Sequence, residues 1–255
     1  MLQRLLRIVK RGPNHLARRA YYAAFPPRPQ CLKMLKETLR GRGLEIGGPS
    51  EIFASVLPVY GSADLDNCNF AASTVWEGSL AEGKTFHYGG KVGQQFVSEA
   101  FALPVASASY DFIISSHMLE HSANPIKVLH EWRRALISAG HLLLVLPYGP
   151  KTMDHRRPIT TLAHLIADFD AGLGEGDLTH VDELIRLHDL EWTPEYRTKD
   201  ELREVLEKNL EHRQMHHHVF DERLAVDLVR HAGFAVLSSE VCFPFHIVVL
   251  AKRLS

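Results

Sequence analysis

A short apolar segment runs directly into a pair of glycines at residues 43–50, with the sequence Gly-Leu-Glu-Ile-Gly-Gly-Pro-Ser. Glycine at positions 47 and 48 permits main-chain conformations that a Cβ would obstruct, and it leaves room for a ligand against the backbone. In α/β proteins, a strand that enters such a turn commonly approaches a nucleoside-like cofactor. An ordinary tight turn has the same local pattern, so the rest of the chain must decide between the two.

Strand and helix patterns alternate along the chain. Apolar runs predict strands at 44–46, within 57–66, and at 110–115, 141–146, 234–237 and 247–251. Helical patterns cover about 32–39, 125–137 and 222–231, and Gly140 is expected to end the second helix. This alternation indicates an α/β fold with a mostly parallel sheet covered on both faces, and the last two strands are expected to form an antiparallel pair at its edge.

The alternation stops between Tyr148 and His218. This segment holds eight of the sixteen histidines, many acids and little strand pattern. An insertion after the carboxyl end of a strand lies where such sheets bind ligands. We therefore expect one domain over residues 31–255, with a helical lid inserted at about 148–218.

The net charge of −1 conceals a strong asymmetry. Residues 1–42 hold eleven Lys and Arg against the single acid Glu37, and the remaining residues are correspondingly acidic. The leader at 1–30 could form a basic amphipathic helix that touches anionic lipid, a second subunit or the acidic body of its own domain; a solvated leader is the alternative. Nucleic-acid binding is not expected, because few aromatic residues are interleaved with the basic ones.

Bulk features point to a cytoplasmic protein without a membrane span. The three cysteines are scattered, which is typical of a reducing compartment and disfavours a cysteine-ligated zinc. No apolar run approaches the length of a membrane span, and basic residues interrupt the first apolar residues, so no signal peptide is expected.

Four motifs, in this order, resemble those of the class I S-adenosylmethionine-dependent methyltransferases of the broad type-11 group. They lie at 45–50, 99–104, 110–121 and 139–147, and are similar to the cofactor loop, the segment that meets the adenine, the fourth strand and the fifth strand. The resemblance implies a Rossmann-like, doubly wound sheet of seven strands with an antiparallel edge strand. Two departures are Pro49 and Glu51 in place of later glycines, and Ser-Ala-Gly at 138–140 in place of the usual Pro-Gly-Gly.

The resemblance also implies S-adenosylmethionine as cofactor. Asp66, which matches the family's Leu-Asp-Asn, is expected at the end of the second strand to accept from both ribose hydroxyls, with Asp64 as the alternative. Glu99 would accept from the adenine amino group, and Glu45 or nearby carbonyls would meet the methionyl ammonium. The other expected cofactor contacts are Gly47, Gly48, Pro49, Ser50, Ala100, Ser115, Ser116 and His117.

Methyl transfer to a hydroxyl requires a proton acceptor, and a neutral histidine suits that role near pH 7. The insertion places Asp154, His155, Arg156 and Arg157 just beyond the fifth strand. We expect His155 to be the general base, Asp154 to orient it or help hold a metal, and the two arginines to position substrate or close the lid. The alternative is that His155 is simply hydrogen-bonded in its loop and Arg157 caps a helix.

The insertion resembles a bacterial subgroup of glycan and sugar O-methyltransferases, such as those acting on methylated mannose polysaccharides in mycobacteria. A polar, charge-rich lid suits a sugar better than a lipid or an aromatic acceptor. His180, His217 and His218 are accordingly expected to contact the acceptor. His121 and His130 are expected to be packing or helix-surface residues.

A divalent metal ion would be a hard one such as Mg²⁺, held by acids including Asp154, Glu120 or Asp177, although the ligand spacing is not decisive. Of the three consecutive histidines at 216–218, at most two could face one ion.

Other functions remain open. The acceptor could be a small natural product or an amine, and a non-catalytic domain that binds the cofactor and serves as a partner module is a different class of function. A nicotinamide-dependent oxidoreductase fits least, because the loop lacks G-x-G-x-x-G.

Overall fold

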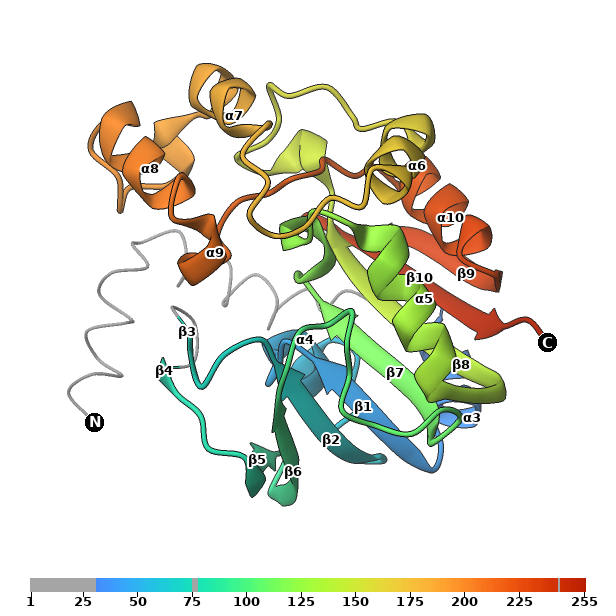
Figure 1. Ribbon diagram of the computed structural model, residues 1–255. Helices are drawn as coiled ribbons and strands as arrows, with labels where there is room; N and C mark the ends of the chain where they lie inside the picture. Colours follow the sequence, from blue (N-terminus) through green and yellow to red (C-terminus); the bar gives the residue numbers. More distant parts are fainter. Residues whose placement is uncertain (1–30, 75–77, 243) are drawn as a thin grey trace.

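The computed structural model describes residues 31–74, 78–242 and 244–255 (Figure 1). The predicted basic leader lies outside the described residues. Eight strands form one sheet in the order β5-β6-β2-β1-β7-β8-β10-β9. Their bounds are β1 (Arg42–Ile46), β2 (Asp64–Asn69), β5 (Gly83–Tyr88), β6 (Lys91–Val97), β7 (Tyr110–Ser116), β8 (Leu136–Pro147), β9 (Phe234–Cys242) and β10 (His246–Arg253), and a separate hairpin pairs β3 (Ser73–Thr74) with β4 (Gly78–Ser79).

The central strands β6, β2, β1, β7 and β8 are parallel, and β10 runs antiparallel between β8 and β9. This arrangement confirms the predicted Rossmann-like α/β class and the antiparallel pair at the edge. The sheet has eight strands rather than seven, because β5 joins β6 through a tight hairpin at the other edge. Gly89 and Gly90 both have positive φ there, as a type I′ turn requires.

Helices cover both faces of the sheet (Figure 1). On one face lie α5 (Pro125–Ala135), α6 (Leu162–Asp170) and α10 (Glu222–His231), and on the other α3 (Leu32–Thr38) and α4 (Glu51–Ser55). Asn124 caps α5 by accepting from the Lys127 N–H, and one face of the helix is fully buried, with Trp132 at its centre. Burial on both faces explains the continuous apolar runs of β7 and β8.

Two predicted boundaries are wrong. The second strand runs from Asp64 to Asn69 and so continues past the predicted range 57–66, in which Leu57, Val59 and Tyr60 form a buried turn packed against α3 and α4. Helix α5 ends at Ala135, since Leu136 is already extended and pairs with Tyr110. Gly140 therefore lies inside β8, next to Ala139 with φ of 61° at a register irregularity, and does not end the helix.

The insertion (residues 148–218) follows the carboxyl end of β8. Its described residues form the helices α6, α7 (Val181–Leu187), α8 (Lys199–Leu206) and α9 (Asn209–His212), together with the 3-10 turns Gly149–Lys151 and Leu190–Trp192. Figure 1 shows these helices gathered over one end of the sheet. A small apolar cluster of its own joins α7, α8 and Met215. Over the described part of the chain, no helix has the length and apolar character needed to cross a membrane.

Candidate active site

The glycine pair forms a tight loop at the carboxyl end of β1. Gly47 is exposed and has φ of 84°, and a Cβ there would approach the Met118 side chain to 3.2 Å. A Cβ on Gly48 would fall 2.1 Å from Cδ of Glu45. Both positions thus require glycine, one for its main-chain conformation and one for the close approach of the carboxylate.

Glu45 lies buried beneath this loop. Its carboxylate accepts from the Ser50 N–H at 3.0 Å and from the Tyr60 hydroxyl at 2.8 Å. The carboxylate therefore fixes the loop from below, through the main chain at Ser50.

Two asparagines of β2 hold the other side of the loop. The side-chain amides of Asn67 and Asn69 each donate to the Gly48 carbonyl at 3.1 Å, and the Gly48 N–H donates to Oδ1 of Asn67 at 3.2 Å. Sequence reasoning missed both residues. An Asn-x-Asn pattern at the carboxyl end of a strand was the available signal.

Asp66 does not end its strand, contrary to expectation. It pairs in register with Leu44, and its carboxylate contacts Arg42 at 2.7 Å and the Tyr110 hydroxyl at 2.9 Å. Arg42 and Tyr110 are the first residues of β1 and β7. The carboxylate thus faces the amino ends of the strands, and the expected place at the carboxyl edge is wrong.

Glu99 follows β6 and meets the insertion. Its carboxylate pairs with the Arg213 guanidinium at 2.5 Å, and Arg213 also lies 3.4 Å from Glu175. Arg213, which sequence reasoning did not identify, lies over the ring of Phe70 at 5.1 Å. The adenine role of Glu99 and Ala100 stays a prediction.

The end of β7 places three polar residues beside the glycine loop. The Ser115 hydroxyl is buried and donates to the Ile46 carbonyl at 3.1 Å, whereas Ser116 is half-buried. His117 has φ of 51°, and its Nε2 lies 2.8 Å from Nδ1 of His246. Burial, followed by the nearby His246, holds the pKa of His117 well below its usual value, so this imidazole is neutral near pH 7.

The 3-10 turn Leu119–His121 turns Glu120 into the interior. Both carboxylate oxygens are buried and form no hydrogen bond with any described residue; the nearest histidine nitrogens are Nδ1 of His117 at 3.7 Å and Nε2 of His121 at 3.9 Å. Burial raises the pKa of Glu120 to about 7. A buried carboxyl with this pKa can gain or lose a proton near neutrality.

Asp154 orients His216 and not His155. Nδ1 of His216 lies 2.6 Å from Oδ2 of Asp154, and the other oxygen accepts from Arg157 at 2.9 Å. Burial opposes protonation of His216, but the Asp154 carboxylate outweighs it and raises the pKa of the imidazole above its ordinary value. Burial also opposes ionisation of Asp154, yet His216 and Arg157 hold its pKa well below the ordinary range.

His155 lies on the outer side of the insertion. Its Nε2 is 3.6 Å from the Asp189 carboxylate, its Nδ1 is 3.1 Å from the Thr152 carbonyl, and its ring leans on Trp192. Arg156 pairs with the same Asp189 at 2.8 Å. The expected Asp154–His155 pair is therefore not formed, because adjacent side chains point to opposite sides of the loop.

Arg157 is buried, and its guanidinium forms hydrogen bonds with several other residues of the protein. Besides Asp154, its guanidinium donates to the carbonyls of His216 at 2.8 Å and His217 at 3.2 Å, and to Glu183 of α7 at 2.8 Å. It joins three parts of the insertion, and neither helix capping nor direct contact with an acceptor is needed to explain it.

A cavity of about 200 Å³ opens beside the Asp154–His216 pair. One wall carries His121, Asp154 and His216, and the others come from the insertion. The insertion supplies Met153, Leu184, His188, Thr193, Glu195, Tyr196, Leu202, Leu206 and Gln214. His121 thus belongs to the cavity wall, whereas His130 packs edge-on against Phe169, as expected of a packing residue.

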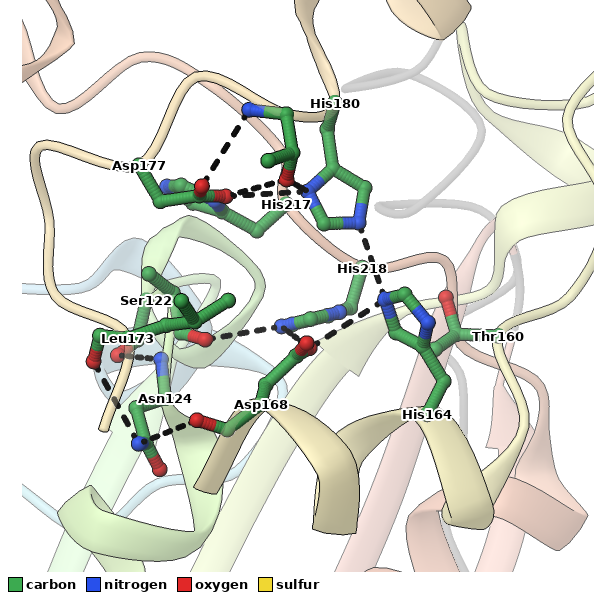
Figure 2. A network of polar contacts seen from close by, with 12 residues as sticks. Ser122, Asn124, Thr160, His164, Asp168, Leu173, Asp177, His180, His217 and His218 are labelled. Atoms are coloured by element: carbon green, nitrogen blue, oxygen red, sulfur yellow. Dashed lines mark hydrogen bonds and ion pairs between the residues drawn. The ribbon is translucent and has the colours of Figure 1, made fainter. Parts of the chain in front are cut away.

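The other predicted acceptor histidines do not line this cavity. His180, His217 and His218 lie in a second histidine group with His164 (Figure 2). The acids expected to hold Mg²⁺ do not converge either, since Asp154 is paired with Arg157 whereas Asp177 lies beside His180. Every convergent group of ligand atoms found among the described residues includes histidines.

Comparison with known proteins finds a family model that matches part of the chain. Residues 44–144 match the family model of the methyltransferase domain. The matched part contains the glycine loop, β2, β6, β7 and the Glu120 turn, and it ends before the insertion. The matched part, which is less than half of the chain, is similar to a methyltransferase domain. No curated protein matches the chain.

Several solved structures are similar at low identity. A methyltransferase from Methanosarcina mazei is 16% identical, with 87% of this chain and 97% of that chain covered and a TM-score of 0.49. One from Mesorhizobium loti is 12% identical, with coverages of 88% and 96% and a TM-score of 0.49. A chain in the complex between the Haloferax volcanii Trm112 methyltransferase activator and a methyltransferase is 11% identical, with coverages of 95% and 93% and a TM-score of 0.49. These values carry no information on acceptor or partner.

The described residues at the carboxyl edge fit S-adenosylmethionine. The exposed main chain of Gly47 offers close approach without a Cβ, and Ser116 ends the neighbouring strand β7. The partly exposed Glu99 carboxylate follows β6, two strands away on the other side. Met118 links this loop to the Glu120 turn and hence to the cavity wall.

Proposed function

We propose that this chain methylates a hydroxyl of a sugar or of the terminal unit of an oligosaccharide. The observation that carries the proposal is the Asp154–His216 pair, which lines a cavity with both polar and apolar walls. Met118 and the Glu120 turn connect this cavity to the glycine loop of the region that matches a methyltransferase domain. S-adenosylmethionine, when bound, supplies a methyl group already activated on a sulfonium, so the protein's task is alignment and proton removal.

The residues proposed to hold the cofactor lie at the ends of neighbouring strands. The main chain at 47–50 would face its amino-acid part, fixed from below by Glu45. Ser116 and His117 would lie beside it, whereas Glu99 and Ala100 would lie nearer the adenine. Asp66 is not included, because its carboxylate faces the other edge of the sheet.

His216 is the proposed proton acceptor. Asp154 engages its Nδ1 and fixes the orientation of the ring, and Nε2, which has no hydrogen-bond partner among residues 31–74, 78–242 and 244–255, would receive the acceptor proton. The Asp154 carboxylate also raises the pKa of the imidazole, and the negative charge of the nearby Glu120 raises it further. A base role for His155 stays a prediction, but its position on Asp189 favours His216 instead.

The cavity favours a small polar acceptor. A volume of about 200 Å³ is below that of ordinary drug-sized sites, so one sugar unit is a better match than a lipid or a fused aromatic. Thr193, Glu195 and Gln214 offer hydrogen-bonding groups, and Leu202 and Leu206 offer an apolar wall for the C–H face of a ring. We accordingly assign the insertion as the acceptor lid.

A labelled-cofactor assay tests the proposal. The purified chain would be incubated with methyl-labelled S-adenosylmethionine and a panel of mono- and oligosaccharides, alongside amines and phenols of similar size. We expect label in a sugar as an alkali-stable methyl ether. Label only in the amines or phenols, or calorimetric binding of NAD without S-adenosylmethionine, would contradict it.

The basic leader is proposed to act separately from the chemistry. Truncation of residues 1–28 should abolish cosedimentation with anionic vesicles if the leader touches a membrane, and should halve the solution mass if it mediates a homodimer. If the truncated chain behaves as the full chain in both assays, neither role holds.

A further inference from the structure

A second histidine cluster lies on the insertion, outside the proposed active site (Figure 2). Three histidines and one acid contribute to it from separate segments. His164 and Asp168 lie four residues apart on α6, His180 precedes α7, and His218 lies in the extended segment that leads back to the sheet. None of the four lines the cavity beside His216.

The nitrogen and oxygen atoms of these side chains converge. Nε2 of His164 lies 3.1 Å from Nε2 of His180 and 3.3 Å from Oδ2 of Asp168, and Nε2 of His218 lies 3.8 Å from the same oxygen. The three histidines present ligand atoms within 4.8 Å of one another. Four ligands around a tetrahedral ion with bonds of about 2.0–2.1 Å would be roughly 3.3 Å apart, which matches the two shorter separations.

The cluster has features of a ligand set rather than of a finished hydrogen-bond network. Oδ2 of Asp168 and Nδ1 of His218 are buried and make no hydrogen bond to any residue in the described ranges. Nε2 of His218 has one long contact of 3.4 Å with the Ala123 carbonyl, which it would give up to an ion.

The surroundings of His180 point the same way. Its Nδ1 lies 3.5 Å from the Asp177 carboxylate, which in turn accepts from the Thr179 hydroxyl at 2.6 Å. A carboxylate on Nδ1 places the proton there and directs the Nε2 lone pair toward His164 and Asp168. The His164 side chain is 45% exposed, so an ion has a route from solvent.

We infer that His164, Asp168, His180 and His218 bind a zinc-type divalent ion that fastens the insertion. Three imidazoles and one carboxylate in a compact set suit Zn²⁺, whereas Mg²⁺ prefers oxygen ligands in an octahedron. The ion would tie α6, the loop before α7 and the 216–218 segment together. The inference does not depend on the acceptor or on methyl transfer.

Metal binding by the full-length chain, produced without a histidine tag, tests the inference. The protein would be stripped with a chelator and titrated with ZnCl₂ by calorimetry, with CoCl₂ as a spectroscopic probe. We expect one Zn²⁺ per chain, the intense visible absorption of tetrahedral Co²⁺, a rise in Tm with zinc, and no competition from excess Mg²⁺. Absence of stoichiometric zinc binding by the stripped chain would overturn the inference.

Variants locate the ion. His164→Gln and Asp168→Asn should each weaken zinc binding at least tenfold and lose the zinc-dependent rise in Tm, and circular dichroism would verify that they fold. His231→Gln, an exposed histidine at the end of α10, should bind zinc as the parent does. His217→Gln separates the neighbouring group Asp177, His180 and His217. If that variant loses zinc whereas His164→Gln and Asp168→Asn retain it, the assigned ligand set is wrong.

Discussion

At the scale of single residues, His155 and His216 form a natural pair of variants, because each lies beside a carboxylate and only one lines the cavity. We expect His216→Gln to lower kcat by about 10²- to 10⁴-fold, as for loss of a general base, with little change in affinity for S-adenosylmethionine. His155→Gln should keep kcat within the same order of magnitude. Kinetics on the acceptor found by the labelled assay would measure both, and the reverse ranking would restore His155 as the base.

Glu120 makes the stability of the protein depend on pH. Its pKa is about 7 in the folded chain against an ordinary 4.5, so the folded state binds more protons between these values and stability falls as pH rises through that window. Glu120→Gln removes this effect. The variant should therefore gain stability relative to the parent between about pH 4.5 and 7, by roughly 3 kcal/mol at full ionisation.

Urea unfolding at a series of pH values would measure the difference for Glu120→Gln. Glu204→Gln, on the exposed side of α8, controls for the substitution itself. A constant offset between Glu120→Gln and the parent across the pH range would show that the carboxyl does not titrate as expected.

Properties of single residues could be predicted from the sequence where they depend only on residues close by in the chain. The glycines at 47 and 48 could be identified because their conformational freedom is a local property. The partner of Asp154 could not, since His216 lies 62 residues away and reaches it only through the fold. Sequence adjacency favoured His155, whose side chain points to the other side of the loop.

At the scale of elements, Arg157 joins the loop after β8, α7 and the segment 216–217, whereas its neighbour Arg156 lies on the surface. Arg157→Gln leaves buried carboxylate and carbonyl groups without their cation and should lower the free energy of unfolding by about 3 to 5 kcal/mol. Arg156→Gln should cost about 0 to 1 kcal/mol, because its guanidinium is more than half exposed and Asp189 keeps a second partner in His155. Denaturant unfolding measures both. Equal losses would mean that the Arg157 contacts contribute little.

Two glycine-to-alanine variants, one in the cofactor loop and one outside it, form a second matched comparison. An alanine at position 48 would place its Cβ 2.1 Å from Glu45, so Gly48→Ala must displace the loop and should weaken S-adenosylmethionine binding at least tenfold. Gly61→Ala has no atom within 4 Å of its new Cβ and should bind as the parent does. Calorimetric titration with the cofactor gives both values. Unchanged affinity in Gly48→Ala would remove the loop from the cofactor site.

The strands that could be predicted are those buried on both faces, such as 110–115, since their apolar runs are continuous. The hairpin β5–β6 was missed because its strands carry glycines and polar residues and lie at the edge of the sheet. The second strand was misplaced because Leu57, Val59 and Tyr60 are apolar for packing in a turn. That error also misplaced Asp66.

At the scale of the whole molecule, the sheet and the insertion differ in how they are held together. Two large clusters cover the faces of the sheet, whereas the α7–α8 region of the insertion relies on five buried residues. We expect the amides of α8 to exchange with deuterium much faster than those of β7, through local opening of the insertion. Hydrogen-exchange mass spectrometry measures this. Exchange of both regions in one concerted step would contradict separate opening.

The three consecutive histidines at 216–218 contact three different groups of residues. His216 faces Asp154, His217 lies 3.2 Å from the Asn209 amide, and His218 lies beside Asp168. The His217 N–H donates to the Glu120 carbonyl, and this backbone hydrogen bond fixes the direction in which each of the three side chains points. A single inserted or deleted residue just before this segment would therefore redirect all three rings at once and disable two sites without replacing any of their side chains.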